Sequence, residues 1–218
     1  MANTPKRGLM TLDLKKAILE RRQSVSHEEW TKLGHWGVER ILHSEEWQQF
    51  SHRESIRIGL YSSLPDEPNL KDLESLAQQK DGVRLYYPRI SDVRAKRMDL
   101  VEVSPFHSDS WVKGAYGIFE PKRELRVATD SELKELDLIF IPGVVFGENG
   151  ERWGRGAGYY DRFLPRVSRA IRVAFAFEFQ LFKKLEQEVW DQKVDWIVTE
   201  CREIRTPRFL EKWKLILK

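Results

Sequence analysis

Apolar residues recur at helical spacing in several stretches of the chain. Between residues 11 and 23, apolar side chains fall among charges at intervals that are typical of an amphipathic helix. Ser26 is followed three residues later by Glu29, a capping-box pattern that predicts a second helix extending toward Phe50. Further helices are predicted over residues 69–80, 130–135, 159–167 and 180–188.

Shorter runs between these segments have the pattern of β-strands. IRIGLY at 56–61 alternates, and LIFIP at 138–142 is continuously apolar, as expected for a strand buried on both faces. Strands are also predicted over 83–88, 99–103, 171–177 and, as the last strand, 196–199. Because strands alternate with helices, we predict an α/β fold with a mainly parallel sheet sandwiched by helices. The N-terminal helices, at about 11–50, should pack on its outside.

Length and composition fit one folded domain spanning residues 1–218. The chain holds 37 basic and 34 acidic residues, a net charge of +3, so its overall charge does not indicate a nucleic-acid partner. The local distribution is more informative, because six arginines fall between residues 152 and 172. Such a cluster suits a phosphate-bearing ligand, although a solvated basic helix face remains an alternative.

Cys201 is the only cysteine, which excludes an intrachain disulfide and fits a reducing compartment. The longest nearly apolar run, residues 138–146, contains Pro142 and Gly143 and is too short to span a bilayer. We therefore expect a cytoplasmic protein without a membrane partner.

The most informative segment is PGVVFGENGERWGRGAGYYDRFL, residues 142–164, which holds six of the 13 glycines. Glycine lets a ligand approach the backbone closely, successive N–H groups form a concave anion site, and a predicted helix follows. Arg152 and Arg155 can add fork-shaped donors. The segment lacks the Gly-Lys-Ser/Thr of a Walker A loop, and Tyr159 replaces the last glycine of the dinucleotide fingerprint. A nucleotide triphosphate site is predicted here, with a mobile surface loop as the alternative.

GERWGRGAGYYDRFL, residues 150–164, closely resembles the signature of 5-formyltetrahydrofolate cyclo-ligases, also called 5,10-methenyltetrahydrofolate synthetases. Segments at 64–68, 116–121 and 194–195 match the family in the same order. The resemblance implies a Rossmann-like, three-layer α/β/α fold of the NagB/RpiA/CoA-transferase type. It also implies ATP- and Mg²⁺-dependent closure of 5-formyltetrahydrofolate to 5,10-methenyltetrahydrofolate, with release of ADP and phosphate. Phosphorylation would make the formyl oxygen a good leaving group.

Matching the signature assigns roles to individual residues. ATP binding is implied for Lys15, Arg152, Trp153, Gly154, Arg155, Gly156, Ala157, Gly158, Tyr159 and Tyr160. Substrate contacts are implied for Ser62, Glu67, Tyr116, Gly117, Arg155, Gly156 and Tyr159. Lys15 and Arg155 are the candidate catalytic cations, and Asp161 and Asp195 match the Mg²⁺ carboxylates. Alternatives remain open: a helix-start charge for Asp161, a strand-edge charge for Asp195, a turn role for Glu67, and core packing for Tyr116 and Phe119.

Three positions depart from the family pattern. Thr11 stands where the family has a lysine, Gly147 where it often has an aspartate, and Trp153 where it often has a leucine. Thr11 and Gly147 favour a non-catalytic paralogue that binds nucleotide or folate. A sugar-phosphate enzyme on a similar frame also stays open, because the arginine-rich loop could hold a sugar phosphate. We expect a monomer in either case.

Overall fold

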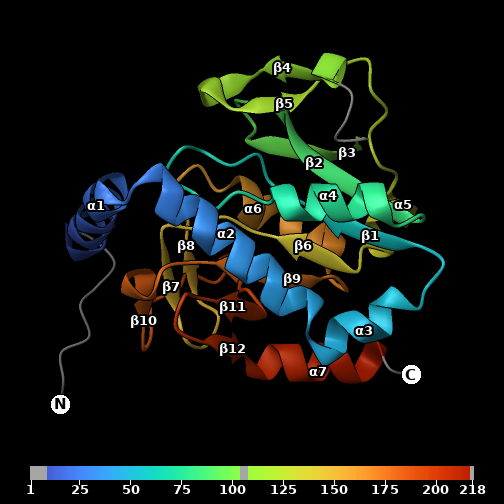
Figure 1. The fold of residues 1–218 in the computed structure, drawn as a ribbon. Helices are drawn as coiled ribbons and strands as arrows, with labels where there is room; N and C mark the ends of the chain where they lie inside the picture. Colours follow the sequence, from blue (N-terminus) through green and yellow to red (C-terminus); the bar gives the residue numbers. More distant parts are fainter. Residues whose placement is uncertain (1–8, 104–107, 217–218) are drawn as a thin grey trace.

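A computed structural model of the protein describes residues 9–103 and 108–216. Its centre is a seven-stranded sheet with the order β12-β11-β9-β6-β1-β2-β3 (Figure 1). The five inner strands run parallel, whereas β3 and β12 at the edges run antiparallel to their neighbours. The predicted α/β fold is therefore confirmed, with a mixed sheet. The strands are β1 (Ile56–Gly59), β2 (Val83–Asp92), β3 (Arg97–Glu102), β6 (Leu138–Phe140), β9 (Ile171–Phe175), β11 (Trp196–Val198) and β12 (Glu203–Arg205).

Helices cover both faces of this sheet, and each face has its own apolar core. Residues of β6 and β9 are buried throughout, as the continuous apolar runs predict. One face packs against α2 (His27–Leu42), α3 (Glu45–Ser51), α4 (Lys71–Gln79) and α7 (Pro207–Ile216). The other packs against α5 (Asp130–Lys134) and α6 (Tyr159–Phe163).

Two smaller sheets lie beside the main one. The first has the order β10-β7-β8, and α1 (Leu9–Ser24) packs on it through Leu14, Ile18 and Leu19. The second is the hairpin of β4 and β5, which projects beyond β2 and β3 (Figure 1). Their bounds are β7 (Val145–Gly147), β8 (Arg152–Trp153), β10 (Leu181–Phe182), β4 (Trp111–Lys113) and β5 (Phe119–Pro121).

Local capping chemistry explains where the N-terminal helices begin and end. The predicted capping box of Ser26 and Glu29 is present and starts α2. The prediction of one helix reaching Phe50 is wrong, because α2 ends at Leu42 and the Ser44 hydroxyl accepts from Trp47 N to start α3.

The C-terminal part of the chain differs more from the prediction. Residues 180–188 do not form the predicted helix, because Leu181 and Phe182 pair with β7 and the Gln180 side chain donates to Val144 O. The strand at 196–198 is not the last one, since β12 and α7 follow it. The predicted helix at 159–167 begins as expected and tightens into a 3₁₀ turn at Leu164–Val167, where Pro165 lies.

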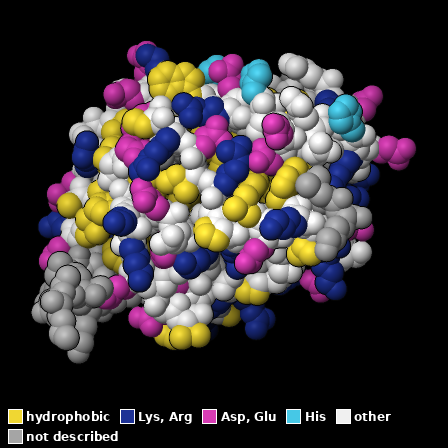
Figure 2. Space-filling model, turned by 90° about the horizontal axis from the view of Figure 1, so that it is seen from below, with side chains coloured by type: hydrophobic (Ala, Val, Ile, Leu, Met, Phe, Trp, Pro, Cys, Tyr) yellow, Lys and Arg dark blue, Asp and Glu magenta, His cyan; other side chains and the backbone are white. Residues whose placement is uncertain are grey.

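The surface below α7 mixes both signs of charge. Figure 2 shows Lys and Arg side chains interspersed with Asp and Glu on the face seen from below in Figure 1. This distribution fits the small net charge of +3. Within the described residues, none of the helices has the length and apolarity needed to cross a bilayer.

Candidate active site

A cavity of about 1190 Å³ lies between α1, the loop after β1, the β4–β5 hairpin and the glycine-rich loop. It brings together most of the residues that the sequence singled out. These are Lys15, Ser62, Glu67, Tyr116, Arg152, Trp153, Gly154, Arg155, Gly156, Ala157, Gly158, Tyr159, Tyr160 and Asp161. Gly117, Phe119 and Asp195 are the candidates that are missing from its described lining.

The glycine-rich loop forms one wall of the cavity, between β8 and α6. Gly156 has a φ of +110°, and no described atom lies within 4 Å of the position that a Cβ would occupy there. Gly158 has a φ of +73° and precedes the first turn of α6. Both residues use left-handed backbone that favours glycine. Gly156 leaves open space above the main chain, whereas Arg162 Nη1 lies 2.6 Å from the position that a Cβ of Gly158 would occupy. The loop is therefore open to a ligand on its cavity side.

The two arginines of the loop are held by carboxylates. Arg152 is buried, and its Nη2 donates to Asp161 Oδ1 over 2.8 Å. Arg155 is more exposed, and its Nη2 lies 2.7 and 2.8 Å from the two carboxylate oxygens of Asp66. Asp66 belongs to the loop after β1, so this contact crosses from one wall of the cavity to another.

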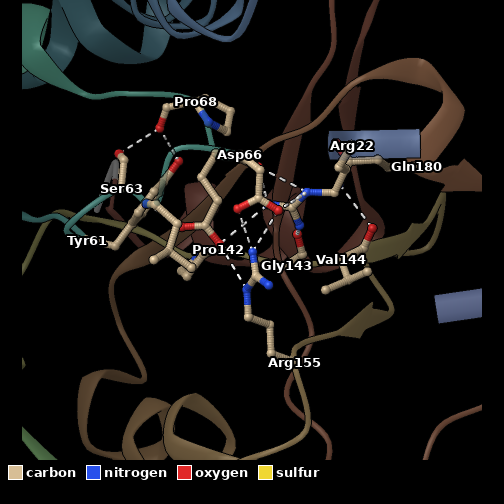
Figure 3. A network of polar contacts seen from close by, with 12 residues as sticks. Arg22, Tyr61, Ser63, Asp66, Pro68, Pro142, Gly143, Val144, Arg155 and Gln180 are labelled. Carbon is tan, nitrogen blue, oxygen red and sulfur yellow. Dashed lines mark hydrogen bonds and ion pairs between the residues drawn. The ribbon is translucent and has the colours of Figure 1, made fainter. Parts of the chain in front are cut away.

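Arg22 of α1 reaches the same Asp66 and joins these walls (Figure 3). Its side chain is only 1% exposed, and it donates to Asp66 O and, over 3.0 Å, to Gly143 O. Sequence reasoning did not single out Arg22 or Asp66. Arg22 lies in a charged run that also suits a solvated helix face, and no local pattern marks it as buried.

Burial sets the electrostatics of this wall. Burial raises the pKa of the Glu67 carboxyl, although Arg22 and Arg155 oppose the shift. Glu67 also accepts a hydrogen bond from Leu64 N over 3.1 Å. Burial lowers the pKa of the Arg22 guanidinium, against the pull of Glu67 and Asp66. Each of these charges depends on its partners, because little water reaches them.

Aromatic residues from the β4–β5 hairpin and from α6 line another part of the cavity. Tyr116 has a φ of 58°, and its ring centroid lies 6.3 Å from that of Tyr159. Burial raises the pKa of Tyr159 to about 12. Tyr116 and Phe119 are 66% and 60% exposed, so core packing is wrong for both. Tyr116 lines the cavity, and Phe119 lies outside its described lining.

Two further groups of the lining come from α1 and the loop after β1. The Lys15 ammonium lies 5.8 Å from the Trp153 ring centroid, over the ring face. Ser62 Oγ is buried, and none of the described residues offers it a hydrogen-bond partner. A buried hydroxyl in this state suits a polar ligand atom, because leaving it unpaired costs about 1–3 kcal/mol.

Two carboxylates line the cavity where the coil before β11 lies next to the start of α6. Asp161 Oδ1 accepts from Gln192 N over 3.1 Å, and both Asp161 and Asp191 line the cavity. Sequence reasoning missed Asp191. In the described residues, no group of three or more His, Cys, Asp or Glu side chains could hold a metal ion.

Asp195 lies elsewhere and has other partners. Its side chain is fully buried, with Oδ2 2.5 Å from Lys212 Nζ and Oδ1 2.8 Å from Arg208 Nε. Arg172 N also donates to Oδ2 over 2.9 Å. The strand-edge solvent charge is therefore wrong for Asp195, because its buried carboxylate anchors α7 beneath the sheet. The contacts of Asp195 give its predicted magnesium role no support.

The family comparison agrees with this geometry. The model of the 5-formyltetrahydrofolate cyclo-ligase family matches residues 8–200. The chain belongs to this family. The match includes α1, the loop after β1, the hairpin and the glycine-rich loop, and so every wall of the cavity.

Individual members of the cyclo-ligase family are similar over most of their length. The 5-formyltetrahydrofolate cyclo-ligase of Mus musculus is 28% identical, with 91% of this chain and 95% of the relative covered. That of Escherichia coli (strain K12) is 27% identical over 85% of this chain and 97% of the relative. The NMR structure of Aquifex aeolicus 5,10-methenyltetrahydrofolate synthetase superposes with a TM-score of 0.73 at 30% identity, covering 89% and 92% of the two chains. The enzyme from Mycoplasma pneumoniae, at 21% identity and a TM-score of 0.64, shares the fold.

Proposed function

We propose that the protein catalyses the ATP-dependent cyclisation of 5-formyltetrahydrofolate to 5,10-methenyltetrahydrofolate, with release of ADP and phosphate. One observation carries the proposal: the residues that match the family signature converge on a single large cavity. Both cationic groups and aromatic side chains line that cavity. A triphosphate and a pterin ring need these two chemistries.

The described residues fit a nucleotide at the glycine-rich loop. Open space above Gly156 leaves the main-chain N–H groups accessible to phosphate oxygens. Lys15 and Arg155 supply positive charge from two sides of the same cavity. Arg152 lies behind them, where it orients Asp161.

Two of the carboxylates that line this wall suit a magnesium ion. Asp161 and Asp191 would hold it, because Mg²⁺ prefers hard oxygen ligands and usually takes one or two carboxylates from the protein. The ion would neutralise charge on the phosphates during transfer.

The reaction demands positioning more than covalent chemistry by the protein. ATP supplies the phosphoryl group that turns the formyl oxygen into a leaving group. Arg155 and Lys15 would stabilise negative charge on the transferred group, and the loop N–H groups would orient it. Glu67 and Ser62 would bind the polar edge of the folate, while Tyr116 and Tyr159 pack on its ring.

We also propose that the protein acts as a cytoplasmic monomer and as one domain over residues 1–218. Its sheet, with helices on both faces, supports the three-layer arrangement of the NagB/RpiA/CoA-transferase type.

Purified protein mixed with MgATP and 5-formyltetrahydrofolate should develop the absorbance of methenyl-folate and release ADP in equal amount. Omitting either ATP or Mg²⁺ should abolish the signal. MgATP binding without product would instead indicate a non-catalytic paralogue, for which the loss of the family lysine at Thr11 is the motivating feature. A reaction with sugar phosphates and no nucleotide requirement would contradict the proposal.

A further inference from the structure

Two arginines and two carboxylates form a compact cluster at the junction of three cavity walls (Figure 3). Arg22 Nε lies 3.4 Å from Asp66 Oδ2, and Arg22 Nη2 lies 3.5 Å from Glu67 Oε1. Arg155 Nη2 lies 2.7 Å from Asp66 Oδ1, and Arg155 Nε lies 3.8 Å from Glu67 Oε1. Each carboxylate is therefore shared between both guanidinium groups, and the four formal charges cancel.

The two arginines differ in how firmly they are held. Arg22 is buried on α1, and two main-chain carbonyls, of Asp66 and Gly143, fix its guanidinium from two loops. Arg155 lies between Gly154 and Gly156, and its side chain is 43% exposed at the cavity. An exposed ion pair is weak and easily exchanged, whereas a buried cation held by several hydrogen bonds stays in place.

The contact of Arg155 with Asp66 engages Nη2, one of the guanidinium donors that a phosphate would use. A carboxylate and a phosphate offer an arginine the same kind of acceptor, so the two compete. If Arg155 leaves, Asp66 and the buried Glu67 still require a counter-ion, because an uncompensated buried charge is strongly unfavourable. Arg22 is already within 3.5 Å of both carboxylates.

We infer that Arg155 changes partner when nucleotide binds, from the Asp66 carboxylate to a phosphate group. Arg22 is the positioning residue that permits this exchange, because it remains as the counter-ion of Asp66 and Glu67. This inference rests on the proposed function, since it takes the phosphate to be that of ATP. Asp66 then competes with the nucleotide for the Arg155 guanidinium, and the ion pair of Asp66 with Arg22 limits how strongly it competes.

The test is a double-mutant cycle on MgATP affinity, measured by calorimetry with the full chain. Asp66→Asn should bind MgATP about tenfold more tightly than wild type, because Arg155 is released. Arg22→Met should bind about tenfold more weakly, because both carboxylates then retain Arg155. Adding Asp66→Asn to Arg22→Met should tighten binding by more than the same change does in wild type.

Three comparisons make the cycle decisive. Arg22→Lys keeps the charge and loses the fork, so its affinity should stay within about threefold of wild type. Arg22→Gln, which is neutral and still a donor, replaces Arg22→Met if that variant does not fold. Asp99→Asn removes a carboxylate from another partly exposed arginine pair, with Arg166 at 3.0 Å, and should leave MgATP affinity unchanged.

The outcomes separate this inference from the proposed function. The partner exchange would be overturned if the effects of Asp66→Asn and Arg22→Met on MgATP affinity were additive. It would also be overturned if Asp66→Asn bound MgATP more weakly than wild type. Arg22→Lys binding as weakly as Arg22→Met would also overturn it, since geometry rather than charge would then matter. Wild-type protein that does not bind MgATP would overturn the proposed function, and the exchange with it.

Discussion

Replacing Arg155 with alanine is expected to lower kcat/KM for ring closure by about two to three orders of magnitude. Arg155 is the cation of the glycine-rich loop that faces the cavity with a partly exposed side chain. Phosphoryl transfer depends on charge neutralisation at the moving group, so loss of a positioned guanidinium raises the barrier. Steady-state kinetics with each substrate varied in turn measures the effect.

The fold should tolerate this change. The ion pair of Arg155 with Asp66 is partly exposed, and such a pair contributes about 0–1 kcal/mol. Arg94→Ala, an exposed arginine in the turn after β2, is the matched control and should keep wild-type kinetics. The kcat/KM of Arg155→Lys should lie between those of Arg155→Ala and wild type, because lysine keeps the positive charge without the forked guanidinium. Wild-type kcat/KM in Arg155→Ala would show that the loop arginine takes no part in the reaction.

Replacing Asp195 with asparagine is expected to lower the free energy of unfolding by about 3 kcal/mol. The substitution leaves Lys212 without a negative partner beneath α7, where burial already lowers the Lys212 pKa to about 8. Arg208 loses its carboxylate as well. Urea denaturation followed by circular dichroism measures the change. The dependence of activity on Mg²⁺ concentration should stay that of wild type.

Asp191→Asn is the matched comparison and should show the reverse pattern. Asp191 lines the cavity, so the variant should need more Mg²⁺ for half-maximal activity while its stability changes little. A raised Mg²⁺ requirement in Asp195→Asn, with unchanged unfolding, would return the metal role to Asp195.

Elements that depend on local chemistry could be predicted from the sequence. The capping box at Ser26 and the apolar run that becomes β6 are examples, since neighbouring residues alone specify them. The segment 180–188 could not, because its conformation follows from pairing with β7 and from the bond between Trp153 Nε1 and Glu186 O. Tertiary contacts override a helical pattern in such a segment.

The candidate site shows the same division. Glycine content and arginines mark the loop directly, so residues 152–161 were identified from sequence. Asp191 and Asp195 are only four residues apart, and sequence gives no means to decide which one faces the cavity. The register of β11 decides it: Asp195 enters the sheet beside Arg172 N, and Asp191 stays in the coil before it. Arg22 could not be identified from sequence either, because its hydrogen-bond partners lie 44 and 121 positions away along the chain.

The attachment of α1 to the small sheet, rather than to the large one, has a thermodynamic consequence. Apart from the buried Arg22, only a few apolar contacts hold this helix, chiefly those around Ile18, Val145 and Trp153. Local opening free energies follow the buried apolar contacts of each unit, so α1 should detach at a lower cost than the central strands. A nucleotide that contacts both Lys15 on α1 and the glycine-rich loop would add contacts that hold α1 against the rest of the protein. Occupancy would therefore suppress fraying of the amino-terminal helix before it measurably protects the sheet.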